Sequence, residues 1–570
     1  MRIGRTLLAA CLTACAATLS MEAPAASGAN AFDLVIVNGR IIDGTGSPWY
    51  SGDVGIRGGH IAAIGRLADA PRRQTIDARG QVVAPGFIDM LGQSELSILV
   101  DPHLPSKIYQ GITTEVTGEG SSVAPLNAAM IDADRPSYEH YRITPDWRTL
   151  GQYFARLERQ GLGINLGSYV GATSVRRMVL GDADVQPTPM QLQAMRSLVR
   201  DAMREGAVGL STALQYAPAP YAHTGELIAL AEEAARPGGV YASHIRSEGA
   251  GETAAIDEAV RIGREAHIPV DIWHLKAAGK PNWGRMPQIV AQIESARAAG
   301  VDVSANTYAY PAWANSMSAF IPPWAHDGGD AALLGRLKDP AVRARIRQDM
   351  LTADAAWDNE WQEIPGPEAV LISVVQNPEL LPLQGRRLSE VAALWQEDPI
   401  DALCDLLIRD QAFTQVAVFG MDETDVALAL RQPWVSIDND SPGTATTGLL
   451  GLEHPHPRAY GTFPRILRKY VREEHLLTLE DAIRKFAALP AQRLRLTDRG
   501  VIKQGMWADL VIFDPSTVTD LATFEQPNQL SQGMRYVLVN GVAVIAEGRM
   551  TQALPGHVVR GPGYTRQQAP

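Results

Sequence analysis

Residues 240–310 read VYASHIRSEGAGETAAIDEAVRIGREAHIPVDIWHLKAAGKPNWGRMPQIVAQIESARAAGVDVSANTYAY. Short runs rich in Val, Ile and aromatic residues alternate there with longer runs in which apolar residues recur at helical spacing. Such strict alternation is typical of parallel βα units. The pattern predicts strands at 206–211, 240–246, 269–276 and 301–310, and helices at 224–235, 253–266 and 286–299.

The length of the region around this stretch favours a closed barrel. Residues 87–490 leave room for eight βα units with insertions, which fits a (β/α)8 barrel of the TIM type better than an open sheet. Residues 312–400 break the alternation with loop-like runs rich in Trp, Pro and Asp. We expect them to form a large insertion that covers the C-terminal face of the barrel, where the active sites of such barrels lie.

The two ends of the chain have the pattern of short strands. Residues 32–86 and 491–552 are rich in Val and Ile, with Gly, Asp and Pro between the runs. The run LVIVNGRII (34–42) is echoed by VLVNGVAV (537–544). We therefore predict one small β-sandwich that is built from both ends of the chain, followed by a tail at 553–570.

The first 28 residues have the features of an export signal. Arg2 and Arg5 form a basic start, and the small apolar run that follows is too short to span a bilayer. Two interpretations remain open. The chain is exported as a soluble periplasmic or secreted protein, or it is held at the membrane by a lipid on Cys15, because LTAC (12–15) resembles a bacterial lipobox.

The overall charge argues against two classes of partner. The net charge is −12 and the pI is about 5.5. Nucleic acids and anionic membranes both require a basic surface on the protein. We therefore expect a small-molecule substrate and no nucleic-acid partner, with the lipid anchor as the one route to a membrane. The oligomeric state is left open.

Three polar residues lie at the ends of predicted barrel strands. His244, His274 and Asp440 follow three separate strands, whose ends share one face of a barrel. Two histidines can hold a zinc ion that keeps a position open for water, and a nearby carboxylate can take up a proton. Each residue alone also fits an ordinary structural role, as a hydrogen-bonded histidine or a turn-capping aspartate.

The combination of motifs makes the chain similar to a known family. Over residues 33–550 it resembles the N-acyl-D-amino-acid deacylases, also called D-aminoacylases, of the amidohydrolase superfamily. The motifs that carry the resemblance are VVAPGFID (82–89), GITT (111–114), GLST (209–212), SHIRSEG (243–249), HLK (274–276) and HPRAYGTFPR (456–465).

The resemblance implies one tightly held zinc ion per chain. Two zinc-binding histidines of the family match His244 and His274, and its cysteine ligand, in an Asn-Cys-Gly turn, matches Glu119. A carboxylate oxygen is a competent zinc ligand, although it makes a harder site that admits other divalent ions more readily. The alternative for Glu119 is a solvated loop carboxylate.

The chain departs from the family directly after the first predicted barrel strand. The family has His-x-His-x-Asp there, whereas this chain has Leu91-Gly92-Gln93-Ser94-Glu95. Leu91 cannot bind a metal and Gln93 is a weak ligand. We therefore expect no second metal site, which argues against a binuclear mechanism of the kind found in dihydroorotase and hydantoinase relatives.

The resemblance also assigns roles around the metal. Asp440 matches the catalytic aspartate, the general base and then the general acid of the reaction. Lys276 and Arg458 match residues that hold the α-carboxylate of the substrate, a task that suits a guanidinium. Tyr308 and Tyr310 match a Tyr-Pro-Tyr motif and are expected to line the pocket. Surface salt bridges and core packing are the alternatives for these four residues.

Three functions remain in competition at this point. The leading one is hydrolysis of a linear amide bond, in an N-acyl-D-amino acid or a dipeptide with a C-terminal D-residue, by zinc-bound water. The second is hydrolysis of a cyclic amide or a lactone, which would not need Lys276 and Arg458. The third is a non-catalytic binding protein that has lost its His-x-His pair. The acyl group, the side chain and the stereochemistry stay open, since one barrel hosts many reactions.

Overall fold

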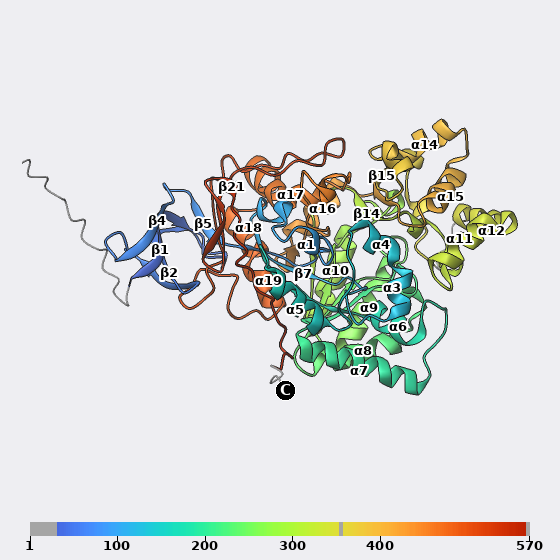
Figure 1. Cartoon of the computed structure of the whole chain (residues 1–570), viewed down its shortest axis with the longest axis horizontal. Helices are drawn as coiled ribbons and strands as arrows, with labels where there is room; N and C mark the ends of the chain where they lie inside the picture. Colours follow the sequence, from blue (N-terminus) through green and yellow to red (C-terminus); the bar gives the residue numbers. More distant parts are fainter. Residues whose placement is uncertain (1–30, 353–356, 566–570) are drawn as a thin grey trace, which may run out of the picture.

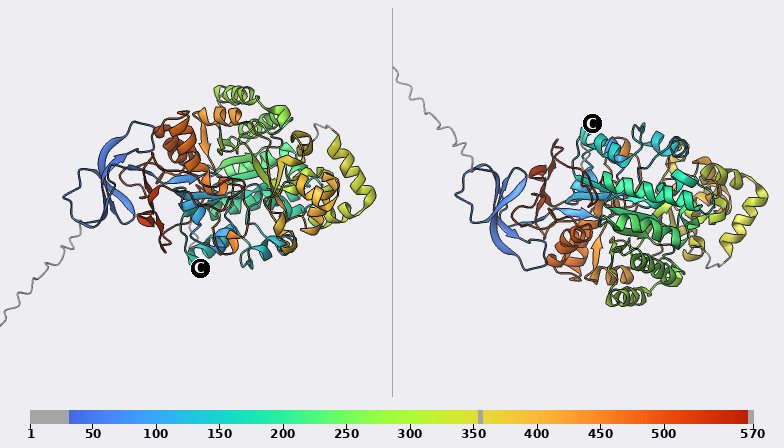
Figure 2. Two further views of the ribbon diagram at one scale, coloured as in Figure 1. Left: turned by 90° about the horizontal axis from the view of Figure 1, so that it is seen from above. Right: turned by 90° about the horizontal axis from the view of Figure 1, so that it is seen from below.

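The computed structural model describes residues 31–352 and 357–565, so the expected export signal and Cys15 lie outside the described residues. Figure 1 shows three parts along the long axis: a β-sheet domain (blue and red) at one end, a barrel in the middle, and a module (yellow) at the other end. The two views of Figure 2 keep this order. Within the described ranges, no helix is long and apolar enough to cross a membrane.

The barrel has the eight parallel strands that the alternating sequence predicts. Each strand is short and fully buried, because helices cover its outer side and packed side chains fill the interior. The strands are β6 (Phe87–Asp89), β7 (Ile112–Thr117), β8 with β9 (Asn165–Ser168 and Val170–Gly171), β10 (Gly209–Ala213), β11 (Val240–His244), β12 (Val270–Ile272), β13 (Val303–Thr307) and β17 (Val435–Ile437).

The barrel closes between its first and last strands. The pairings β6-β7-β8 and β9-β10-β11-β12-β13-β17 are all parallel. A parallel bridge between Gly92 and Ser441 joins the segments that follow β6 and β17. The amide of Asp440 donates to the carbonyl of Leu91 at 2.9 Å in the same place. Closure therefore brings the segment with the missing histidines next to Asp440.

The helices of the barrel confirm the sequence prediction closely. The expected helix at 224–235 matches α8 (Thr224–Ala235), and the other two differ by one residue at their ends. The helices that follow the eight strands are α2 (Pro105–Ile108), α5 (Leu150–Gln160), α7 (Pro189–Glu205), α8, α9 (Glu252–Glu265), α10 (Met286–Ala298), α16 (Glu423–Arg431) and α18 (Leu479–Phe486). Further helices are α1 (Ser97–Val100), α3 (Ala128–Ala133), α4 (Arg135–His140), α6 (Ala172–Leu180), α17 (Arg458–Arg465), a π-helix (Ile466–Glu473) and α19 (Ala488–Arg493).

The β-sheet domain is built from both ends of the chain, as predicted. Strand β5 from the N-terminal part pairs with β18 from the C-terminal part, with Leu510 opposite Pro85. Apolar side chains from both parts share one core. The strands are β1 (Phe32–Ile41), β2 (Tyr50–Arg57), β3 (His60–Gly65), β4 (Arg72–Asp77), β5 (Val82–Pro85), β18 (Leu510–Phe513), β19 (Met534–Val539), β20 (Val542–Ala546) and β21 (Arg549–Met550).

The two similar runs, 34–42 and 537–544, each contain an Asn-Gly pair, and the two pairs have different roles. Asn540 and Gly541 form the hairpin turn between β19 and β20. Asn38 and Gly39, in contrast, lie within β1, where the register to β2 shifts. The amide of Asn38, at a φ of 58°, donates to Asp53 Oδ1 at 3.0 Å. Residues Phe32–Ile41 therefore form one strand with a bulge.

The inserted module follows β13 and is longer than the expected 312–400. Its three-stranded sheet has the order β14-β16-β15, and β16 ends only at Val418. The predicted end of the insertion at residue 400 lies inside α15. The apolar pattern of a single module helix is the same as that of a barrel helix, so the sequence does not separate them. The elements are β14 (Trp313–Ser316), α11 (Asp330–Lys338), α12 (Pro340–Leu351), α13 (Glu360–Glu363), β15 (Val370–Val374), α14 (Leu388–Trp395), α15 (Pro399–Arg409) and β16 (Gln415–Val418).

Asp509 ties the sheet domain to the barrel. Its Oδ2 accepts from Arg499 at 2.6 Å and from the Asn165 side chain, at the start of β8, at 3.1 Å. Its Oδ1 accepts from the amide of Asn540 at 2.7 Å. Asp509 and Arg499 are 4% and 6% exposed, so each is the main buried partner of the other's charge, and the half-exposed Asp498 adds a weaker contact to Arg499 at 3.3 Å.

Replacing Asp509 by Ala should therefore lower the free energy of unfolding by about 3 kcal/mol, because the buried Arg499 then keeps only its weaker contact with the half-exposed Asp498. Urea unfolding followed by tryptophan fluorescence measures the change. Asp201→Ala serves as the control, since Asp201 pairs with Arg204 on an exposed helix surface, and its loss should cost less than about 1 kcal/mol. Equal effects of the two substitutions would contradict this account of the domain contact.

Candidate metal centre

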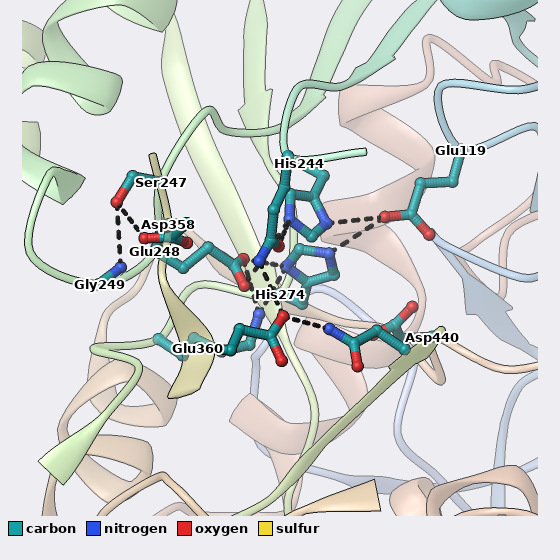
Figure 3. A network of polar contacts seen from close by, with 12 residues as sticks. Glu119, His244, Ser247, Glu248, Gly249, His274, Asp358, Glu360 and Asp440 are labelled. Atoms are coloured by element: carbon teal, nitrogen blue, oxygen red, sulfur yellow. Dashed lines mark hydrogen bonds and ion pairs between the residues drawn. The ribbon is translucent and has the colours of Figure 1, made fainter. Parts of the chain in front are cut away.

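Three side chains converge at the rim formed by the C-terminal ends of the barrel strands. Glu119 follows β7, His244 ends β11 and His274 follows β12. Glu119 Oε1 lies 3.1 Å from His244 Nδ1 and 3.3 Å from His274 Nε2. One ligand atom from each residue lies within 4.8 Å of the other two. Figure 3 shows both imidazole rings facing the Glu119 carboxylate.

The outer nitrogen of each imidazole has a fixed partner. His244 Nε2 lies 2.9 Å from the side-chain oxygen of Gln215. His274 Nδ1 lies 2.8 Å from Glu248 Oε1 and 2.8 Å from Lys276 Nζ. Here the inner nitrogens donate to Glu119; with a metal ion bound, the acceptors Gln215 and Glu248 would hold the ring protons on the outer nitrogens and free the inner nitrogens as electron-pair donors. Two imidazole nitrogens and one carboxylate oxygen are the donor set of a divalent zinc site, so the residues present fit the ion.

The backbone holds two of the site residues in uncommon conformations. His274 and Asp440 have φ angles of 38° and 45°, in the left-handed region that residues with a Cβ rarely adopt. Such strained residues are found mostly at functional sites, where the surrounding structure enforces them. Both lie within three residues of the C-terminal end of a barrel strand, β12 or β17, and so at the rim.

The Glu119 carboxylate is held in its charged form. Burial alone would raise its pKa, but the hydrogen bonds with His244 and His274 outweigh this and hold the pKa well below its usual range. The turn that carries Glu119 is flanked by Gly118 and Gly120, which have φ angles of 97° and 61°. A Cβ at Gly120 would lie 2.5 Å from the backbone of Ala213, so this approach of the turn to β10 requires glycine.

Asp440 lies beside this group of ligands. Its Oδ2 forms an ion pair with Arg458 Nη1 at 2.7 Å, and its Oδ1 accepts from Gln93 Nε2 at 3.0 Å. Burial raises the pKa of Asp440, although Arg458 opposes this shift. The carboxylate thus has a fixed orientation at the rim, where a proton acceptor next to a metal ion is required.

The side chains at the two missing histidine positions make other contacts. The amide of Gln93 donates to Glu119 Oε2 at 2.8 Å as well as to Asp440. Leu91 is fully buried in the interior of the barrel, in a cluster with Val116 and Trp273. A neutral amide donor therefore bridges the two carboxylates, and a hydrocarbon side chain occupies the other position.

A buried triad beneath Gln93 was missed by sequence reasoning. The ammonium of Lys107 lies 2.8 Å from Asp89 Oδ2 and 3.5 Å from Glu115 Oε2, and all three side chains are fully buried. A Cβ at Gly92 would lie 1.9 Å from Glu115 Oε1. Asp89 ends the VVAPGFID motif, but no local pattern pairs it with Lys107 or Glu115, because the triad assembles from three segments when the barrel forms.

The residues expected to hold a carboxylate already have partners. Lys276 Nζ lies 2.7 Å from Glu248 Oε1 and lines the cavity at the site. Arg458 lies behind Asp440, with its guanidinium carbon 4.6 Å from the centre of the Tyr308 ring. Both expected tyrosines are fully buried rather than lining the cavity. Tyr310 points away, toward the carbonyl of Pro457 at 3.4 Å.

The cavity at the site has a volume of about 200 Å³ and a polar wall. The inserted module provides one side of this wall, which sequence analysis anticipated only as a cover without named residues. The motif that contains Glu248 was recognised, but the role of Glu248 was not. The lining residues are Gln93, Glu119, Tyr216, His244, Glu248, His274, Lys276, Trp313, Ala314, Asn315, Ser316, Gln415 and Asp440.

Known proteins match this chain over most of its length. A model of a family described as the amidohydrolase family matches residues 74–545. N-acyl-D-glutamate deacylase and D-aminoacylase, both from Alcaligenes xylosoxydans xylosoxydans, are 37% and 35% identical, over 93% and 94% of this chain and 96% and 98% of theirs. The crystal structure of N-acyl-D-glutamate deacylase from Bordetella bronchiseptica, complexed with zinc and a phosphonate inhibitor, superposes with a TM-score of 0.77 at 34% identity. This superposition covers 93% of this chain and 100% of that one.

If Gln93 and Leu91 keep a second metal ion out of the site, replacing both by histidine should raise the metal content. The double variant Leu91→His/Gln93→His should bind about two zinc ions per chain where the natural chain binds one, because two imidazoles then replace an amide and a methyl surface. Elemental analysis of zinc-saturated, desalted protein measures this. Leu91→His alone is the control for disturbing the core and should stay at one ion. A double variant with no gain would show that these positions do not set the metal count.

Proposed function

The chain belongs to the amidohydrolase family, and from this premise we propose that it hydrolyses the linear amide bond of an N-acyl-D-amino acid, or of a dipeptide with a C-terminal D-residue. The observation that carries the proposal is the convergence of Glu119, His244 and His274 beside Asp440 at one rim of the barrel. The relatives named above supply the substrate class.

The chain's own residues divide the work of the reaction. A zinc ion, when bound by the three ligands, polarises a carbonyl group and lowers the pKa of water. Asp440 holds a proton acceptor at Oδ1 and can return the proton to the departing nitrogen. Arg458 orients Asp440 through its 2.7 Å ion pair, and Lys276 presents an ammonium to the cavity beside it. These two cations are placed to attract a substrate carboxylate.

The two competing functions find less support. A cyclic amide or a lactone has no carboxylate, and it would leave Lys276 and Arg458 without a substrate group to attract. A binding protein without catalysis would not need Asp440 in a strained conformation next to the metal ligands. The retained acceptor and the two cations together favour a hydrolase that acts on a linear, carboxylate-bearing amide.

We also propose that the enzyme acts outside the cytoplasm. The support is the basic start, the short apolar run and the small residues within 1–28. The N-terminal residue of the protein isolated from cells distinguishes the two forms: a start after residue 20 favours soluble export, and a blocked, lipid-bearing Cys15 favours the anchor.

The role of Asp440 gives the direct test of the proposed chemistry. Asp440→Asn keeps the shape of the side chain but removes its proton acceptor, so kcat for N-acetyl-D-amino acids should fall by about 10³-fold, with zinc content unchanged. Asp302→Asn is the control. Asp302 is an exposed carboxylate directly before β13, at the end of the barrel opposite the metal ligands. Undiminished turnover in Asp440→Asn would exclude it as the general base.

A further inference from the structure

One wall of the metal-site cavity comes entirely from the inserted module. Residues Trp313–Ser316 of β14 and Gln415 of β16 line it, and the register places Ser316 opposite Gln415. The reaction itself needs none of these residues, since the metal ligands and Asp440 come from the barrel. A wall that faces the site without taking part in the chemistry is placed to contact another part of the substrate.

This wall presents hydrogen-bond acceptors. Asn315 is 8% exposed and donates through Nδ2 to Glu360 Oε1. Its Oδ1 is buried and has no partner among the described residues. Gln415 donates through Nε2 to the carbonyl of Phe413 at 2.9 Å, which directs its oxygen the other way. A buried carbonyl without a partner is costly, and a donor from a bound ligand would relieve that cost.

The charges around the wall disfavour a second anion. Glu119, Glu248 and Asp440 line the cavity, and Lys276 is its one cationic lysine or arginine. Lys276 is bonded to Glu248, and Arg458 behind the wall is paired with Asp440. One substrate carboxylate near these cations is compensated, but a second one would be buried without a partner.

The carboxyl group of Glu360 adds no positive charge that could offset a second anion. It lies behind Asn315 and also accepts from Gln215 at 2.8 Å, while its Oε2 is buried without a partner. Figure 3 shows it on the same side of the two histidines as Glu248. The side chain is fully buried, and burial raises the pKa of Glu360 to about 8, so the module places a largely uncharged carboxyl group, and no cation, next to the wall.

From these contacts we propose that Asn315 and the β14 wall bind the side chain of the D-amino acid, and that they select one ending in an uncharged hydrogen-bond donor, such as a primary amide, over one ending in a carboxylate. The inference rests on the proposed function and narrows its substrate class. It separates this chain from a relative named for D-glutamate, because the isosteric D-glutamine derivative becomes the preferred substrate.

Three substrates of nearly equal shape test the selection. We expect N-acetyl-D-glutamine to exceed N-acetyl-D-glutamate in kcat/KM by about 100-fold, the effect of burying an unpaired charge. It should exceed N-acetyl-D-methionine, which has no donor, by about tenfold, the effect of one hydrogen bond to a buried acceptor. A preference for the glutamate derivative would overturn the inference.

Two variants test whether the β14 wall causes these substrate preferences. Asn315→Leu should reduce the glutamine-over-methionine preference to about one, whereas Asn377→Leu, elsewhere in the same module, should leave it unchanged. Gln415→Lys adds a cation to the wall and should reduce the glutamine-over-glutamate preference at least tenfold. If Asn315→Leu fails to fold, the result from Gln415→Lys still decides, and an unchanged preference there counts against the wall.

Calorimetric binding of free D-glutamine and D-glutamate to the zinc-loaded protein separates the inference from the proposed function. Tighter binding of D-glutamine supports the selection even if none of the acylated compounds is hydrolysed, in which case the proposed function alone fails. Equal or tighter binding of D-glutamate contradicts the selection, whatever the hydrolytic activity.

Discussion

The contact of one carboxylate oxygen of Glu119 with two histidines organises the functional rim of this molecule. Its Oε1 faces His244 Nδ1 and His274 Nε2 at 3.1 and 3.3 Å. Three buried polar side chains gathered this closely are stable only when their charges and hydrogen bonds are matched. Much of the surrounding structure supplies that match: the amide of Gln215, the carboxylate of Glu248 and the amide of Gln93 each satisfy one outward atom.

The two residues that stand in place of the His-x-His pair both make contacts that fit their surroundings. The amide of Gln93 hydrogen-bonds to both Glu119 and Asp440, and so offsets part of the repulsion between these two carboxylates. Leu91 completes the apolar interior beneath. The arrangement orients Asp440 with a neutral donor on one side and Arg458 on the other, which is consistent with catalysis by a single metal ion.

Much of the fold was predictable from the sequence because it depends on local periodicity. The alternation over residues 206–310 located strands and helices within a few residues, and the two valine-rich ends identified the shared sheet. The length of the module was not predictable, because a helix such as α15 has the same pattern whether it covers the barrel or extends from it. The bulge at Asn38 was missed because it depends on partners in other strands, such as Asp53.

Some residues of the site could likewise be predicted from the sequence, and others could not. Residues at or just beyond the ends of barrel strands, such as His244 and His274, were identified because strand ends define the functional face. The buried ammonium of Lys107 and the wall around Asn315 depend on contacts between distant segments, which no local pattern encodes. Arg458 was identified through its motif, but only the structure shows that its nearest anion is Asp440.

The central claim is that this rim holds one catalytic divalent ion through Glu119 and two histidines. The most direct test is the zinc content of the purified mature protein and of Glu119→Ala, measured together with hydrolysis of N-acetyl-D-amino acids. The account predicts close to one zinc per chain in the natural protein, and loss of both zinc and activity in the variant. Activity that persists in a zinc-free protein, or a zinc content that Glu119→Ala leaves unchanged, would contradict it.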